Sequence, residues 1–232
     1  MSPDPLTKIA VLISGRGTNL QSIIDAVQRG DVDASIAVVV SNREDAPGLE
    51  RARRAGLETL CISHRDFRTR ETFDERLVQE LQTRGVTLVC LAGFMRIFST
   101  PMLDAYRNRM LNIHPSLLPA FPGLHPQQQA IDHGVKVSGV TVHLVDGVLD
   151  GGPIVVQRTV PVLDDDTAET LSARILEEEH RAYPDALALI LADEWRVEGR
   201  RFIRRPVAAA DAKDEAGAAE KSRMRPDPIT KL

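Results

Sequence analysis

The sequence predicts an α/β protein with a mostly parallel, twisted sheet and helices on both of its faces, a Rossmann-like arrangement. Short apolar runs typical of strands alternate with helical stretches along the chain, which is the pattern of a parallel sheet. The run Ser35–Val40 is almost continuously apolar, as expected of a strand covered on both faces. In the C-terminal half, one strand is expected to run antiparallel to its neighbours.

The N-terminal half begins with a strand over Lys8–Ile13, which leads into a glycine-rich turn. Thr18 and Gln21 have the spacing of a capping box, so a helix is expected from Thr18 to about Arg29. The elements that follow are the strand Ser35–Val40, a helix over Pro47–Ala55 closed by Gly56, a helix with the apolar stripe Phe73, Leu77, Val78 and Leu81 that ends before Gly85, and a strand over Thr87–Ala92.

The C-terminal half opens with a brief strand over Leu111–Ile113. The alternating run 140–145 then predicts a half-exposed, antiparallel strand. The remaining elements are a strand over Ile154–Val160, a helix over Ala168–Ala192 with a kink or break at Pro184, and a hairpin of Trp195–Val197 and Arg201–Ile203. Residues 206–232 carry few large apolar side chains, so the sequence predicts a folded domain over 1–205 and a disordered tail over 206–232.

Composition limits the class of protein. A chain of 232 residues fits one domain with a sizeable core, and its net charge of −4 argues against a nucleic-acid partner. The N-terminus has no signal-peptide pattern, and no apolar run is long enough to span a bilayer, so no membrane partner is expected. Cys61 and Cys90 lie in apolar runs and are expected to be buried free thiols of a cytoplasmic protein, with a structural disulfide between them as the alternative.

Asn112, His114 and Asp150 are the most informative residues of the chain. Asn112 and His114 are two positions apart at the end of an apolar run, so both side chains point the same way if that run is a strand. Pro115 ends the regular structure and places both groups at the carboxyl edge of the sheet, where open α/β folds bind ligands. Asp150 could pair with the imidazole and favour its charged form.

A second candidate site is the turn after the first strand. Gly15 and Gly17 let the backbone turn tightly, and the N-terminus of the following helix offers free amides to an anion. The pattern lacks the third glycine of the dinucleotide fingerprint and the lysine of a Walker loop. On its residues alone, the turn is either a phosphate cradle or an ordinary strand-to-helix connection.

These motifs resemble the formyl-transferring domains that use 10-formyltetrahydrofolate. The likeness rests on Asn112–Pro119 together with Leu149–Pro153, and it extends over roughly residues 8–203. It continues through the segments 12–20, 92–97, 122–125, Glu179-His180 and Tyr183-Pro184. Within this family, the opening segment is similar to members that formylate the amine of glycinamide ribonucleotide in purine synthesis.

The resemblance also implies which residues bind each substrate. The ribonucleotide would lie against the first turn and a glutamate of the long helix, at Gly17, Thr18, Asn19 and Glu179. The folate would be bound by Arg70, Met95, Arg96, Ile97, Phe98, Asn112, Asp146, Gly147, Val148, Leu149 and Asp150. Phe98 departs from the family pattern if an aliphatic residue is usual there, and it is expected to line an apolar wall of the pocket.

The mechanism implied by the resemblance is direct formyl transfer, with 10-formyltetrahydrofolate as co-substrate and without a metal or a covalent enzyme intermediate. Asn112 and His114 would stabilise the oxyanion, and Asp150 would hold the imidazole. Three alternatives remain: a formyltetrahydrofolate hydrolase, a methionyl-tRNA formyltransferase, and a folate-binding protein without activity. The histidines lack the spacing of a zinc site, and the sequence leaves open whether the protein is a monomer or a homodimer.

Overall fold

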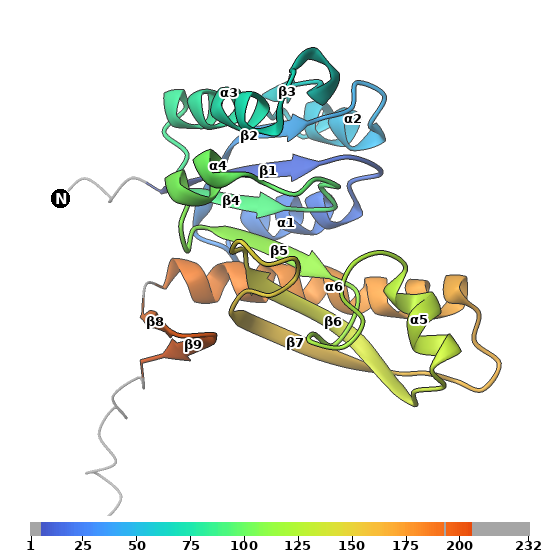
Figure 1. Ribbon diagram of the computed structural model, residues 1–232. Coiled ribbons are helices and arrows are strands. Elements are labelled where there is room, and N and C mark those ends of the chain that lie inside the picture. Colours follow the sequence, from blue (N-terminus) through green and yellow to red (C-terminus); the bar gives the residue numbers. More distant parts are fainter. Residues whose placement is uncertain (1–5, 193, 206–232) are drawn as a thin grey trace, which may run out of the picture.

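The computed structural model describes residues 6–192 and 194–205 of the chain. Nine strands form one sheet in the order β3-β2-β1-β4-β5-β6-β7-β9-β8 (Figure 1). The strands are β1 (Thr7–Ile13), β2 (Ala34–Ser41), β3 (Thr59–Cys61), β4 (Leu88–Leu91), β5 (Met110–His114), β6 (Val137–Leu144), β7 (Ile154–Pro161), β8 (Trp195–Glu198) and β9 (Arg201–Arg204). The predicted mostly parallel sheet is confirmed, because β1 to β5 all pair in parallel.

Helices cover both faces of this sheet, as predicted (Figure 1). They are α1 (Thr18–Arg29), α2 (Pro47–Arg54), α3 (Arg70–Thr83), α4 (Thr100–Ala105), α5 (Pro126–Asp132) and α6 (Ala168–Leu191), with one turn of 3-10 helix over His64–Asp66. Alternate residues of β1 enter two separate cores: Val11 packs with side chains of α1, α2 and α6, and Leu12 packs with side chains of α3 and α4. The period of two along β1 therefore distributes its apolar side chains between the two layers.

Strand β6 is antiparallel to both β5 and β7, as predicted, but it is not half-exposed. Every residue from Ser138 to Leu144 is buried, including Thr141 and His143. The alternation of polar and apolar side chains was therefore a wrong guide to exposure. Thr141 and His143 are buried because their side chains make hydrogen bonds inside the protein, to the Ser116 and Leu144 carbonyls among others.

Three local predictions are also corrected. Thr18 is the first residue of α1 but does not cap it, because the cap position is Gly17 in the left-handed conformation with no side-chain hydrogen bond. Cys61 is exposed, since it lies on the edge strand β3, whereas Cys90 in the central strand β4 is buried and both thiols are free. Helix α6 is continuous through Pro184, so of the predicted kink or break the break is excluded. The predicted tail over 206–232 lies outside the described residues.

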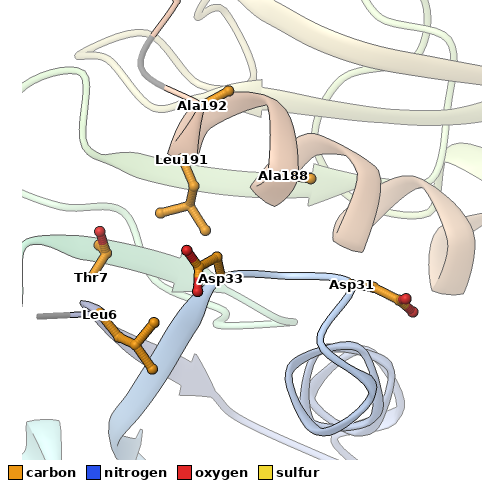
Figure 2. A pocket seen from close by; sticks show the side chains of 7 residues that line it. All are labelled: Leu6, Thr7, Asp31, Asp33, Ala188, Leu191 and Ala192. Atoms are coloured by element: carbon orange, nitrogen blue, oxygen red, sulfur yellow. The ribbon is translucent and has the colours of Figure 1, made fainter. Parts of the chain in front are cut away.

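A pocket of about 440 Å³ lies at the edge of the sheet where β1 and β2 begin (Figure 2). It is lined by Leu6, Thr7, Asp31, Asp33, Ala188, Leu191 and Ala192. None of the predicted site residues lines this pocket. The carboxyl ends of β1, β4 and β5 lie at the other edge, where parallel sheets bind their ligands, so we place the functional site there.

Candidate active site

The structure brings Asn112, His114 and Asp150 together. Asn112 and His114 lie two residues apart on β5, and His114 is the last residue of that strand. Strand β6 ends beside Leu111, and the loop over 145–153 folds back along β5 to deliver Asp150. The Nδ1 atom of His114 lies 3.5 Å from Oδ2 of Asp150, and both side chains are less than a tenth exposed. Such burial strengthens the attraction between the two groups.

His143 is a further member of this cluster, and no motif in the sequence predicts a role for it. It lies directly opposite Asn112 in the β5–β6 ladder, and its Nε2 atom is 3.2 Å from Nδ2 of Asn112. Its Nδ1 atom is 2.9 Å from the Leu144 carbonyl, an acceptor, so Nδ1 carries the proton. Burial lowers the pKa of His143, which keeps the ring neutral. Nε2 therefore accepts a hydrogen bond, and the Asn112 amide must present its NH₂ group to it.

The second nitrogen of His114 is also occupied. Nε2 lies 2.9 Å from the carbonyl oxygen of Phe121, in the loop that follows β5. This loop is held by Thr141 on β6, whose hydroxyl donates to the Ser116 carbonyl and accepts from the Leu118 amide. Both nitrogens of His114 therefore face oxygen acceptors, an arrangement that an imidazolium with two N–H donors satisfies on both sides.

The glycine turn lies between β1 and α1, with its carbonyl groups bound by α2. The Gly48 amide donates to the Gly15 carbonyl at 3.0 Å, and Nε of Arg51 donates to the Arg16 carbonyl at 2.9 Å. Gly17 has a φ of 70°, and a Cβ atom there would lie 2.8 Å from Cα of Gly48. Only glycine fits this close approach. The first amides of α1 have no acceptor within the helix and can bind an anion.

Asn19 and Glu179 lie together beside this turn. Nδ2 of Asn19 donates to Oε2 of Glu179 at 2.6 Å, which joins α1 to α6 across a sequence separation of 160 residues. Burial raises the pKa of Glu179, and the hydrogen bond from Asn19 partly offsets that rise. Two residues that the resemblance assigns to the ribonucleotide are therefore neighbours in space, on two different helices.

The predicted folate-binding segment forms the loop after β4. Met95 and Ile97 are largely exposed, and the Arg96 guanidinium lies over the Phe73 ring, 4.8 Å from its centroid. Phe98 is only 6% exposed and stacks on Phe94 in the core, with the ring centroids 5.6 Å apart. The expectation that the Phe98 side chain lines the pocket wall is therefore wrong, because the ring points inward and supports the loop from below.

Exposed apolar side chains gather in three loops around the trio of Asn112, His114 and Asp150. Of the eight large apolar residues that are exposed in the described part of the chain, five belong to these loops: Met95, Ile97, Leu124, Val148 and Leu149. The last two lie in the predicted folate loop with Asp146 and Gly147, and Oδ1 of Asp146 accepts from the Val148 amide at 2.8 Å. Arg70 is exposed at the first position of α3 and is not in contact with the trio. Together these loops offer an apolar surface to a flat ligand.

Comparison with known proteins shows the family to which the chain belongs. Residues 7–187 match the formyl transferase family, and the chain belongs to that family. It is 43% identical to the phosphoribosylglycinamide formyltransferase of Escherichia coli K12, over 88% of this chain and 93% of that protein. It is similar in structure to glycinamide ribonucleotide transformylase 1 from Symbiobacterium toebii, with a TM-score of 0.85, 52% identity, and coverage of 88% of this chain and 99% of the other.

Longer relatives contain the same unit. The chain is 49% identical to the trifunctional purine biosynthetic protein adenosine-3 of Drosophila melanogaster over 79% of its own length. It spans only about one seventh of that relative, 14% of its length. Within the described residues, no helix is both long enough and apolar enough to cross a membrane.

Proposed function

We propose that the protein transfers the formyl group of 10-formyltetrahydrofolate to the amine of 5'-phosphoribosylglycinamide, giving 5'-phosphoribosyl-N-formylglycinamide for purine biosynthesis. The observation that carries the proposal is the cluster of Asn112, His114 and Asp150, in which the His114 and Asp150 side chains are buried. The glycine turn with Asn19 and Glu179 suits a phosphorylated sugar, and the apolar loops suit a pterin. The enzyme is expected to act in the cytoplasm as a monomer or homodimer.

The reaction is a direct transfer between two nitrogen atoms. The primary amine nitrogen of 5'-phosphoribosylglycinamide forms a bond to the formyl carbon. That carbon becomes tetrahedral, and its oxygen becomes negatively charged. Collapse of this intermediate breaks the bond between the formyl carbon and N10 of the folate. N10 then gains a proton and the new amide nitrogen loses one, so that no net proton is consumed.

The chain supplies donors for the oxyanion. Nδ2 of Asn112 carries two hydrogens, one of which is bound to His143, so the other is free to donate to the formyl oxygen. His114 can donate a second hydrogen bond and deliver a proton toward N10, while Asp150 holds the charge of the ring. Because Nε2 of His114 is bound to the Phe121 carbonyl in the structure, that bond must open if Nε2 is to reach the substrate.

Substrate dependence tests the proposal. The purified protein is incubated with 10-formyltetrahydrofolate, with and without 5'-phosphoribosylglycinamide, and tetrahydrofolate formation is followed. We expect folate release only when the ribonucleotide is present, with the formylated ribonucleotide formed in equal amount. Folate release without the acceptor would indicate a hydrolase, release only with methionyl-tRNA would indicate the tRNA enzyme, and binding without turnover would indicate an inactive binding protein.

A further inference from the structure

The loop over 92–99, between β4 and α4, is tied to buried side chains at both of its ends. Ser14 binds its beginning, and Asp74 binds its end. We propose that Ser14 and Asp74 are positioning residues for the formyl donor, because they hold the segment 95–98 in the shape that receives the folate. This inference rests on the proposed function, since it concerns how the same site is held.

Ser14 binds the beginning of the loop through both its backbone and its side chain. Its amide donates to the Gly93 carbonyl at 3.0 Å, and its hydroxyl accepts from the Met95 amide at 2.9 Å. The same hydroxyl donates to Oδ1 of Asn42 at 2.6 Å, at the end of β2. Ser14 and Asn42 are both buried, so water does not compete for these hydrogen bonds. The Ser14 hydroxyl therefore links the Met95 backbone to the residue that follows β2.

Asp74 binds the end of the loop from α3. Its Oδ2 atom accepts from the Ser99 amide at 2.6 Å and from the Ser99 hydroxyl at 2.5 Å. Its side chain is almost fully buried, and Oδ1 has no hydrogen-bond partner among the described residues. Burial raises the pKa of Asp74, and the Ser99 hydrogen bonds oppose that rise together with the charges of Arg96 and Arg70.

The contact between Asp74 and Ser99 is not part of the capping of α4. Ser99 occupies the cap position of that helix, but its side chain makes no capping bond and is committed to Asp74 instead. A buried carboxylate with one oxygen unpaired is costly in stability, and such costs are typical of groups kept for function. Phe73, the neighbour of Asp74, carries the Arg96 guanidinium on its ring. Helix α3 thus orients both the end and the middle of the loop.

The acceptor site has its own supports, so the two sites can be tested separately. The carbonyl groups of Gly15 and Arg16 are bound by α2, through Gly48 and Arg51. Loss of the Ser14 hydroxyl leaves those two hydrogen bonds intact. If Ser14 and Asp74 position the loop for the formyl donor, their loss should weaken the binding of 10-formyltetrahydrofolate alone. General destabilisation would weaken the binding of both substrates.

The test compares Ser14→Ala and Asp74→Ala with the wild-type enzyme. Each removes hydrogen bonds that hold the loop, and we expect the KM for 10-formyltetrahydrofolate to rise about five- to tenfold, as loss of about one buried hydrogen bond implies. The KM for the ribonucleotide is expected to stay within about twofold of the wild-type value. Calorimetric titration with 10-formyltetrahydrofolate in the absence of acceptor should show the same loss of affinity.

Two variants serve as controls. Asp74→Asn keeps an acceptor oxygen for Ser99, so it should restore most of the donor affinity lost in Asp74→Ala. Ser138→Ala alters a buried serine at the far end of β6 and should leave both KM values unchanged. Unchanged donor affinity in folded Ser14→Ala and Asp74→Ala proteins, or equal losses for both substrates, would overturn the inference. Failure of the proposed function would instead appear as absence of formyl transfer in the wild-type protein.

Discussion

At the scale of single residues, the Asn112 amide is a hydrogen-bond donor that is fixed before any substrate arrives, whereas His114 must release the Phe121 carbonyl before its Nε2 can donate. Asn112 is oriented by a neutral histidine across the strand pair, and His114 is held between a carboxylate and a carbonyl group. A donor that needs no reorganisation stabilises the transition state more than one that must first turn away from water. His143 therefore acts through Asn112 and has no need to touch the substrate itself.

The first prediction concerns Asn112 and His114. Each is expected to stabilise the oxyanion, so Asn112→Ala and His114→Ala should each lower kcat by about 10²–10³-fold. Thermal unfolding measured on the same preparations shows whether the variants are folded, and single-turnover kinetics separate the chemical step from binding. Near-normal turnover in a folded His114→Ala protein would remove this residue from the catalytic role.

At the scale of elements, helices support two of the ligand loops and supply one residue of the site. Helix α2 binds the carbonyl groups of the glycine turn, α3 binds the loop after β4, and α6 supplies Glu179. Tyr183, one turn after Glu179, is fully buried, and its hydroxyl lies 3.1 Å from the Leu91 carbonyl and 3.0 Å from the Leu111 carbonyl. Helix α6 therefore also contacts the end of β4, which leads into the folate loop, and the neighbouring strand β5, which carries Asn112 and His114.

The second prediction tests the support of the glycine turn by α2. A substitution at Gly17 would strain a left-handed residue and collide with Gly48, so it confounds binding with folding. Arg51→Gln instead removes only the Nε bond to the Arg16 carbonyl and a nearby positive charge. We expect the KM for the ribonucleotide to rise about tenfold, with the KM for the folate unchanged.

Arg54→Gln is the matched control for that experiment. Arg54 lies on the same helix, is largely exposed, and among the described residues pairs with Glu50 alone, at the surface. An exposed pair of this kind contributes little, so the variant should resemble the wild-type enzyme in both KM values. An Arg51→Gln protein with wild-type affinity for the ribonucleotide would show that α2 does not support phosphate binding.

At the scale of the whole molecule, local patterns predicted the elements well and their tertiary partners poorly. The two-residue spacing of Asn112 and His114 placed both side chains on one side of β5, because the period of a strand is a local property. The contact between Asn112 and His143 depends on strand register across 31 residues, which no local pattern encodes. Phe98 was misplaced for the same reason, since its inward direction is set by packing against Phe94.

Stability of the whole molecule should fall as the pH falls below neutral. Burial lowers the pKa of His143, and burial together with the charge of Arg51 lowers the pKa of His180. In the unfolded chain both rings take up protons as the pH falls through about 6.5, whereas in the folded protein they resist protonation. The stabilisation is therefore complete above that pH and is lost as the pH falls toward the folded-state pKa values.

Urea unfolding at about pH 7.5 and at about pH 5.5 measures this decrease in the free energy of unfolding. Each histidine can contribute no more than about 1.4 kcal/mol per pH unit. In His143→Gln the free energy of unfolding should fall less between the two pH values than in the wild-type protein. His133→Gln alters an exposed histidine and should keep the wild-type difference. Asp74 and Glu179, whose pKa values burial raises, act in the opposite direction, but they are common to all three proteins. An identical pH dependence in His143→Gln and wild type would show that the ring is not held neutral, and the orientation inferred for the Asn112 amide would lose its support.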